Sequence, residues 1–190
     1  MNKLIHLALA GVVIAQLHGC AAVVVGGAAV GTSAALDRRT TGVYVSDQEI
    51  ELHAMDRLRK AYPQKTNSIS ATSYNRQVLL TGQVQDEATR SGAAKVVKQI
   101  PDVRTVFDEL SVGAVSSFSE NAGDTSITSN VIARMLTDAN VPSSQIKVVT
   151  EAGVVYLMGL VTQAEAKAAT EVASTSTGVT KVVTLFEIIN

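Results

Sequence analysis

The order of apolar and polar positions predicts one set of elements twice along this chain. In the first set, Ile50, Ala54 and Leu58 recur at helical spacing, and Pro63 ends that helix because proline lacks the backbone donor. Two β-rich runs, a second helical pattern and a third β-rich run follow. The predicted elements are a helix capped by Ser46 or Asp47, strands at 68–73 and 77–84 joined by a turn at 74–76, a helix capped by Asp86 with Ala88, Gly92, Val96 and Ile100 on one face, and a strand at 103–112.

The second set repeats this order. Asp124 or Thr125 opens a helix in which Ile127, Val131 and Met135 share a face. The pattern then switches to β-rich runs around a polar turn, as in the first set. The remaining predicted elements are strands at 145–150 and 154–161 joined by a turn at 151–153, a helix at 163–177, and a strand at 179–189.

An apolar–x–x–Gly–x–Val motif marks the same point of both sets. Gly82 and Gly159 lie 77 positions apart, each late in the second predicted strand. A motif that recurs together with its flanking elements indicates a duplicated module. Because glycine has no Cβ, another backbone or the following helix can approach closely, and we therefore assign both glycines a structural role.

The order of elements constrains the topology of each module. A hairpin makes the first two strands antiparallel, and a strand–helix–strand unit makes the second and third parallel through a right-handed crossover. We therefore predict an α+β fold of two tandem αββαβ modules, each a three-stranded mixed sheet with two helices. Modules of about 65–70 residues are marginal alone, so we expect the two copies to support each other.

The first 19 residues have the pattern of a bacterial lipoprotein signal peptide. Lys3 gives a positive start, and the mostly apolar run at 4–17 is shorter than the roughly 20 residues that span a bilayer. The sequence Leu-His-Gly-Cys that ends at Cys20 resembles the lipobox, in which the cysteine becomes the first mature residue and carries the acyl chains. The alternatives are a plain signal peptide with a chance cysteine and a cytosolic protein with an apolar start.

Residues 20–45 are predicted to be a lipidated flexible tether. Residues 21–35 are almost all Ala, Val, Gly, Ser and Thr, and the polar segment 37–42 follows. As a random coil, the chain from Cys20 to Ser46 spans roughly 28 Å, which keeps the modules close to the membrane. The alternative is an uncleaved membrane anchor formed by one long apolar block, in which Gly27 and Gly31 would provide a small-xxx-small helix contact.

Composition and motifs argue against catalysis and against nucleic-acid binding. The formal net charge is −1, aromatic residues make up 4%, and there is no Trp, so a basic field and stacking platforms are both missing. Beyond the signal peptide the chain has one histidine, His53, and it has no nucleophile–base set, metal-ligand spacing, phosphate loop or dinucleotide fingerprint. We therefore expect no enzyme activity, no cofactor and no metal site.

The module order, the glycine of the second strand, and the entries to the third strand at 101–103 and 178–182 resemble the BON domain. Two such domains behind a lipobox resemble the dual-BON outer-membrane lipoproteins of Gram-negative bacteria, the DolP (YraP) type, over nearly the whole chain. The resemblance implies a signal peptide at 1–19, a lipidated tether at 20–45, BON domain 1 at 46–113, a linker at 114–123, and BON domain 2 at 124–190.

The resemblance also implies a location and a function. Proteins of this type face the periplasm from the inner leaflet of the outer membrane, support outer-membrane integrity, and bind anionic phospholipid through the first helix of the second BON domain. Ala21 stands where an Asp would favour inner-membrane retention. The matched candidates for phospholipid contact are Thr125, Ser126, Ile127, Asn130, Val131, Arg134 and Met135.

Two features of this chain depart from that pattern. Ser126 stands where the family often has Trp, whose ring would seat such a helix among headgroups. From Glu120 onward, four basic residues face seven acids, a formal charge of −3. Binding would then rest on Ile127, Val131 and Met135 inserting, with Arg134 on a phosphate. The alternative is that these apolar residues are core.

The competing function is a protein-interaction adaptor for outer-membrane assembly or division-site machinery. The first module is charge-balanced, with nine basic residues and nine acids, and Arg57, Arg59 and Lys60 gather at the end of its first helix. Those cations also complement the helix dipole. We expect a monomer whose partners are the membrane or outer-membrane assembly proteins.

Overall fold

The computed structural model describes residues 37–113 and 118–190, which belong to one compact unit from Asp37 to Asn190. The predicted signal peptide, Cys20 and the tether up to residue 36 lie outside the described residues. Within the part that is described, no helix is long and apolar enough to cross a membrane.

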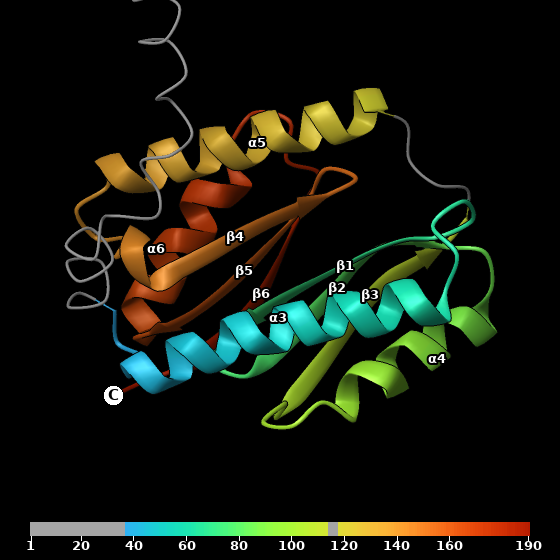
Figure 1. The fold of residues 1–190 in the computed structure, drawn as a ribbon. Coiled ribbons are helices and arrows are strands. Elements are labelled where there is room, and N and C mark those ends of the chain that lie inside the picture. The colour runs from blue at the N-terminus through green and yellow to red at the C-terminus, as the bar shows by residue number, and fades with distance from the viewer. Residues whose placement is uncertain (1–36, 114–117) are drawn as a thin grey trace, which may run out of the picture. The chain divides into compact units, whose positions relative to one another are not determined.

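The first module follows the predicted order of elements (Figure 1). Ile50, Ala54 and Leu58 are buried at four-residue intervals, so they form the apolar stripe of the first helix as predicted. The elements are α3 (Thr41–Ala61), β1 (Ser68–Tyr74), β2 (Gln77–Val84), α4 (Glu87–Lys98) and β3 (Thr105–Val112).

The second module repeats this arrangement. Its two central turn residues, Ala152 and Gly153, have positive φ, as do Asn75 and Arg76 in the first module, and this conformation suits two-residue hairpins. The elements are α5 (Phe118–Thr137), a 3-10 turn η2 (Ser143–Gln145), β4 (Ile146–Glu151), β5 (Val154–Val161), α6 (Gln163–Ser174) and β6 (Lys181–Ile188).

Each module has a three-stranded mixed sheet with its second strand in the middle. β2 pairs antiparallel with β1 and parallel with β3, and β5 pairs in the same way with β4 and β6. The α+β fold and the mixed sheets predicted from the sequence are confirmed.

The central strands contain glycine where the neighbouring backbone comes very close. Gly82 has a φ of +117°, and a Cβ added there would lie 1.9 Å from the carbonyl oxygen of Ser68. A Cβ at Gly159 would lie 2.6 Å from the carbonyl oxygen of Gln145. The close approach therefore comes from the chain entering the first strand, rather than from the following helix.

Two helices begin earlier than the sequence predicted. Thr40 caps α3, its Oγ1 accepting the Val43 N–H at 3.3 Å, so residues 41–45 are helical rather than part of the tether. α5 begins at Phe118, inside the predicted linker. The first turns of α3 leave Tyr44 37% and Val45 49% exposed, and a helix turn that buries little leaves no amphipathic signal.

The buried face of α4 lies one residue away from the predicted one. Asp86 caps the helix as predicted, its Oδ1 accepting the Thr89 N–H at 2.7 Å. Thr89, Ala93 and Val97 are buried, whereas Ala88 is exposed. Two neighbouring stripes of small and apolar residues were available, and periodicity alone could not choose between them.

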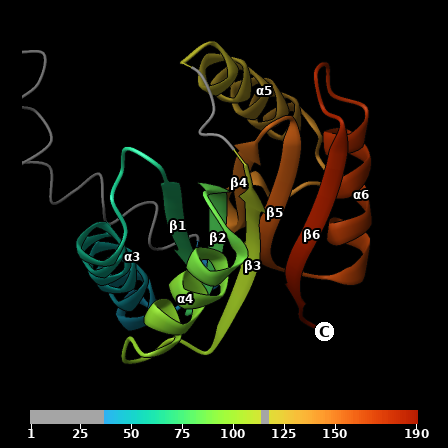
Figure 2. The same ribbon diagram turned by 90° about the vertical axis from the view of Figure 1, so that its right-hand side faces the viewer.

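The two sheets pack face to face, with helices on both outer faces (Figures 1 and 2). α3 and α4 cover one sheet and α5 and α6 the other, each pair enclosing a core of its own module. A third cluster joins the two sheets and includes Leu79 and Tyr156, which are equivalent under the 77-residue repeat. The copies thus meet through the same face, as in the contact of a twofold dimer.

Polar contacts at the strand ends complete this junction. Gln83 Nε2 donates to Glu151 Oε1 at 2.6 Å. Burial, assisted by the nearby Glu109 carboxylate, raises the pKa of Tyr156 to about 12. Glu187 Oε2 accepts three hydrogen bonds from the first module, donated by Asn75 at 2.8 Å, Gln77 at 3.2 Å and Arg104 at 3.2 Å.

Candidate functional site

Helix α5 carries the seven residues that the sequence indicated for phospholipid contact, and two of them are core residues. Val131 is 0% and Met135 1% exposed, both within the core that α5 and α6 form with their sheet. Ile127 packs against the edge of the same core. The predicted insertion of Val131 and Met135 into lipid is therefore wrong, because these side chains hold the helix on its own sheet.

Arg134 is engaged within its own module. Its Nη1 donates to the Val172 carbonyl at 2.9 Å and to Ser176 Oγ at 2.7 Å, and its Nη2 donates to Thr175 Oγ1 at 2.9 Å. These partners surround the C-terminal end of α6, where free carbonyls and the helix dipole favour a cation. The predicted contact with a phosphate would require Arg134 to leave this position.

The outward face of α5 combines hydroxyl groups with two exposed apolar side chains. Thr125 and Ser126 are exposed and Asn130 is half-buried. Ile132 is 39% and Leu136 68% exposed, and the sequence analysis missed both. Their signal is in the sequence, because they are four residues apart and each follows a core residue, Val131 or Met135, by one position.

An acidic residue near the start of the first helix caps the hairpin turn in both modules. Asp47 accepts the N–H groups of Asn75 at 2.8 Å and Arg76 at 2.7 Å. Asp124, 77 positions later, accepts those of Ala152 at 2.8 Å and Gly153 at 2.9 Å. Both aspartates had been predicted as candidate caps of their own helices. That prediction is wrong for Asp47 and Asp124 because their carboxylates face the hairpin.

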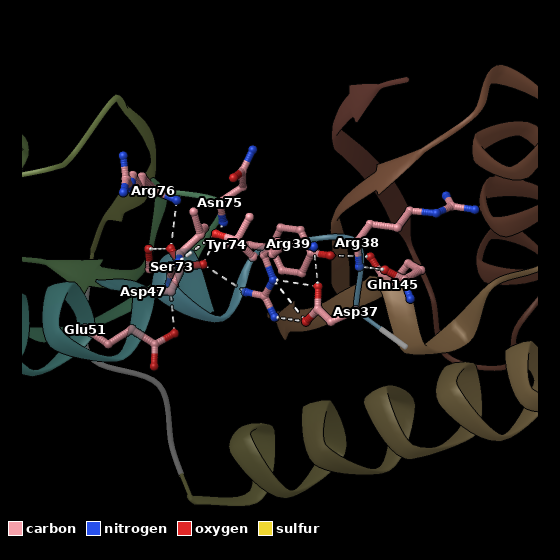
Figure 3. A network of polar contacts seen from close by, with 12 residues as sticks. Asp37, Arg38, Arg39, Asp47, Glu51, Ser73, Tyr74, Asn75, Arg76 and Gln145 are labelled. Carbon is pink, nitrogen blue, oxygen red and sulfur yellow. Dashed lines mark hydrogen bonds and ion pairs between the residues drawn. The ribbon is translucent and has the colours of Figure 1, made fainter. Parts of the chain in front are cut away.

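Asp47 also belongs to a buried ionic cluster with the segment before α3 (Figure 3). Arg39 pairs with Asp37 at 2.6 Å and with Asp47 at 2.9 Å, and all three side chains are less than a tenth exposed. The guanidinium lies 3.9 Å from the centroid of the Tyr74 ring, a distance at which a cation–π interaction stabilises. Burial works against the charge of Asp37, but the bonds from Arg39 outweigh it and lower the pKa of Asp37.

The neighbouring residue, Arg38, reaches the other module. Its Nη1 and Nη2 each bind one carboxylate oxygen of Glu165 at 2.7 Å, and its backbone N–H donates to Gln145 Oε1 at 2.8 Å. This bidentate pair lowers the pKa of Glu165 to about 2. Tyr74 adds a bond between the modules, its hydroxyl donating to the Gln145 carbonyl at 2.9 Å.

We call residues 37–40 the strap, since consecutive arginines in it bind different modules. The strap lies inside the segment 20–45 that the sequence analysis assigned to the flexible tether, and the prediction of a flexible tether is therefore wrong for residues 37–40. Through these arginines the strap contacts both modules near the junction between the two sheets.

Comparison with known proteins gives the family. The family model of the BON domain matches residues 46–114 and 123–190. The chain belongs to the BON domain family. The resemblance to the dual-BON proteins of the DolP type is thereby confirmed, and α5 is the first helix of the second BON domain.

Three relatives show how far the similarity extends. The chain is 37% identical over 172 residues to the outer membrane lipoprotein DolP of Haemophilus influenzae, covering 90% of this chain and 89% of that protein. It is 30% identical to the 21 kDa hemolysin of Actinobacillus pleuropneumoniae, covering 78% of this chain and 77% of that protein. It is 38% identical to osmotically-inducible protein Y of Escherichia coli K12, covering 62% and 60% respectively.

The BON domains offer no arrangement of metal ligands where the structure can be read. In residues 37–113 and 118–190, no three His, Cys, Asp or Glu side chains are grouped so that they could hold a metal ion.

Proposed function

We propose that this BON protein is an outer-membrane lipoprotein anchored through Cys20 on the periplasmic side, and that its second BON domain binds anionic phospholipid and supports outer-membrane integrity. The name of the Haemophilus influenzae relative, an outer membrane lipoprotein, supports the location. The lipobox-like residues that end at Cys20 support the anchor. No catalytic role is part of this proposal.

The observation that carries the lipid-binding part is the exposed pair Ile132 and Leu136 on α5. Neither side chain is needed for the module core, and the two lie one helical turn apart. Fully burying such a side chain contributes about 1.5–3 kcal/mol. The proposed contact surface is therefore Thr125, Ser126, Ile132 and Leu136, in place of the buried Val131 and Met135.

Charge contributes little to this contact. Arg134 is the one basic residue of α5 and is bound to the end of α6. Each cation near an anionic surface adds only about 1 kcal/mol, and the second module is acidic overall. A lipid anchor raises the local concentration to the order of millimolar, so a weak apolar contact is enough to hold the second domain against the membrane surface.

The test compares two exposed apolar sites of the same fragment, residues 37–190. Ile132→Ser with Leu136→Ser should reduce binding to vesicles of anionic phospholipid by about tenfold or more, because two apolar side chains no longer insert. Leu52→Ser is the matched control, since Leu52 is 72% exposed on the first helix of the other domain and should leave binding unchanged.

Vesicle co-sedimentation at fixed lipid concentration measures the effect. If Leu52→Ser reduced vesicle binding as much as the double variant does, the contact with lipid would not lie on α5. Equal binding of the unmodified fragment to neutral and anionic vesicles would contradict the selectivity for anionic lipid.

A second candidate function is that of a protein-interaction adaptor. A groove between α4 and β3 of the first domain has an apolar floor, Ala94 and Val106, and is lined by Lys95, Lys98 and Arg104. Such a groove suits an acidic segment of another outer-membrane protein. Crosslinking from Lys95 in intact cells would capture that protein, whereas the lipid-binding function predicts no single protein there.

A further inference from the structure

Strand β6 forms an open edge of the second sheet. Among the described residues it pairs with β5 alone, so one row of its backbone N–H and C=O groups has no strand partner. Figure 2 shows β6 at the outside of the sheet beside α6. A groove of about 640 Å³ follows this edge, with Phe186 and Ile188 of β6 on one side and Ala166 and Thr170 of α6 on the other. Open edges of this kind pair readily with another strand.

The equivalent edge of the first domain is strand β3, which carries an ion pair. Arg90 of α4 donates to the carboxylate of Asp108 on β3 at 3.2 Å and to its carbonyl at 3.3 Å. Asp108 pairs with Leu80 in the first sheet as Thr184 pairs with Leu157 in the second. Arg90 lies four residues after the cap of α4, as Ala166 does after the cap of α6. The equivalent positions in the second domain are therefore Ala166 and Thr184, and the charge pair is lost there. Charged side chains at a sheet edge discourage strand pairing, and the second domain has no counterpart of the Arg90–Asp108 pair.

The sequence of β6 is complementary to itself in one antiparallel register. If Thr184 lies opposite its own copy, Lys181 lies opposite Glu187, and apolar residues fill the positions between. Lys181 and Thr184 are exposed, and the donors that Glu187 binds within the chain all use Oε2. The other carboxylate oxygen can therefore accept a second copy's lysine. The intervening cross-strand pairs are Val182 with Phe186 and Val183 with Leu185, combinations that stabilise antiparallel sheets.

Helix α6 offers a matching surface on the same side. Ala166, Thr170 and Ser174 line the groove at four-residue intervals. The Thr170 hydroxyl donates to the Ala166 carbonyl at 2.6 Å and the Ser174 hydroxyl to the Glu171 carbonyl at 3.0 Å. These groups can be covered without losing a hydrogen bond. Small side chains also let a second helix approach closely.

The exposed charges of α6 suit the same twofold arrangement. Lys167 and Glu171 are both exposed, and an antiparallel second helix brings each beside the opposite charge of the other copy. A contact that is complementary to itself in this way is the signature of a closed twofold dimer.

We propose that two copies of this chain associate through β6, antiparallel with Thr184 at the twofold axis, so that two three-stranded sheets become one six-stranded sheet. The monomer expected from the sequence is then the dissociated form. This contact uses neither the outward face of α5 nor the strap, so its test is independent of the proposed lipid binding.

The test places charges on the axis. Thr184→Lys and Thr184→Glu each put like charges opposite each other, and each should raise the dimer dissociation constant about tenfold. An equal mixture of the two variants puts lysine opposite glutamate and should restore association to at least the unmodified level. Recovery in the mixture also shows that both variants are folded.

Sedimentation equilibrium of the full mature chain in detergent, from micromolar to millimolar concentration, measures these constants. Ser111→Lys and Ser111→Glu are the matched controls, because Ser111 is exposed on the β3 edge of the other domain, and neither should change association. An unmodified chain that stays monomeric over this range overturns the proposal. So does a mixture that associates no better than its components.

A covalent readout checks the register itself. In the Thr184→Cys variant, two copies of residue 184 face each other across the axis, and mild oxidation should convert most of the protein into a disulfide-linked dimer. The unmodified chain, which keeps Cys20, gives the background, and Ser111→Cys should not exceed it. Crosslinking of Thr184→Cys no greater than that of Ser111→Cys overturns the register.

Discussion

Gly82 and Gly159 stand at equivalent positions of the two BON domains but meet different constraints. Gly82 combines a positive φ of +117° with a backbone oxygen 1.9 Å from where a Cβ would lie. Gly159 has only the close approach, at 2.6 Å. An L side chain at Gly82 would therefore meet both backbone strain and a clash, whereas at Gly159 a small shift of the chain before β4 relieves the contact.

This difference predicts unequal costs of the same substitution. Gly82→Ala should lower the free energy of unfolding by about 3–5 kcal/mol, since strain and overpacking add. Gly159→Ala should lower it by about 1–3 kcal/mol. Urea denaturation of residues 37–190 measures both, and equal losses would show that the positive φ at Gly82 carries no penalty.

At the scale of the element, the hairpin of each domain is capped by an aspartate from its first helix, but the two environments differ. Asp47 is 1% exposed and also pairs with Arg39. Asp124 is half-exposed and, among the described residues, has no basic partner within ion-pair distance. The hairpin cap of the first domain therefore belongs to a buried ion pair, whereas that of the second domain is partly exposed to solvent.

Asparagine substitutions should separate these two situations. Asp47→Asn should lower the free energy of unfolding by about 3–5 kcal/mol, because it leaves Arg39 with one buried partner fewer. Asp124→Asn should lower it by about 1 kcal/mol, the usual contribution of a hydrogen bond. Urea denaturation gives both values.

Amide exchange provides the local control for this pair of variants. The N–H groups of Asn75 and Arg76 should exchange faster in Asp47→Asn, and those of Ala152 and Gly153 faster in Asp124→Asn. A larger loss of stability in Asp124→Asn would contradict the role given to the buried pair.

The central strands could be predicted because a turn precedes each of them and a helix cap follows. β2 and β5 match the predicted ranges 77–84 and 154–161, since each apolar run lies between a turn and a helix cap. The helix starts were not predictable to the same degree. The capping residue Thr40 has no apolar stripe beside it, and α5 begins nine residues before Ile127, the first residue of its predicted apolar stripe.

The candidate site was predictable only in part. Periodicity grouped Ile127, Val131 and Met135 on one face correctly, but it could not say whether that face meets core or lipid. In the structure this face packs against the core. The exposed apolar residues are Ile132 and Leu136, each one position after a buried residue of that face. Arg134 reaches the end of α6, more than thirty residues away in the chain, and spacing within one helix carries no information about such a contact.

At the scale of the whole molecule, the strap joins the two domains where the chain enters the fold. Arg38 binds Glu165 of the second domain while Arg39 is buried against Asp47 of the first. The partners of Arg38 lie more than a hundred residues away, so no local pattern could have revealed them, and the sequence had assigned this segment to the tether. A pulling force on a membrane anchor at Cys20 would therefore be transmitted to the contacts between the two domains.

The Arg38–Glu165 pair should give the molecule a defined acid sensitivity. The pKa of Glu165 falls from its ordinary value of 4.5 to about 2 in the folded protein, chiefly because of Arg38. A carboxylate with a lowered pKa stabilises the fold above its unfolded pKa, and this stabilisation is lost as the pH falls through the folded value. The difference in Tm between the unmodified protein and Arg38→Met should therefore be constant above about pH 5 and shrink toward pH 2. Thermal unfolding of residues 37–190 followed by circular dichroism measures it.

In a Glu165→Gln background the effect of Arg38→Met should be smaller and independent of pH, because the titrating partner is gone. A difference that persists unchanged at pH 2 would mean that Arg38 stabilises the junction through its bonds to Leu160 and Gln145 alone.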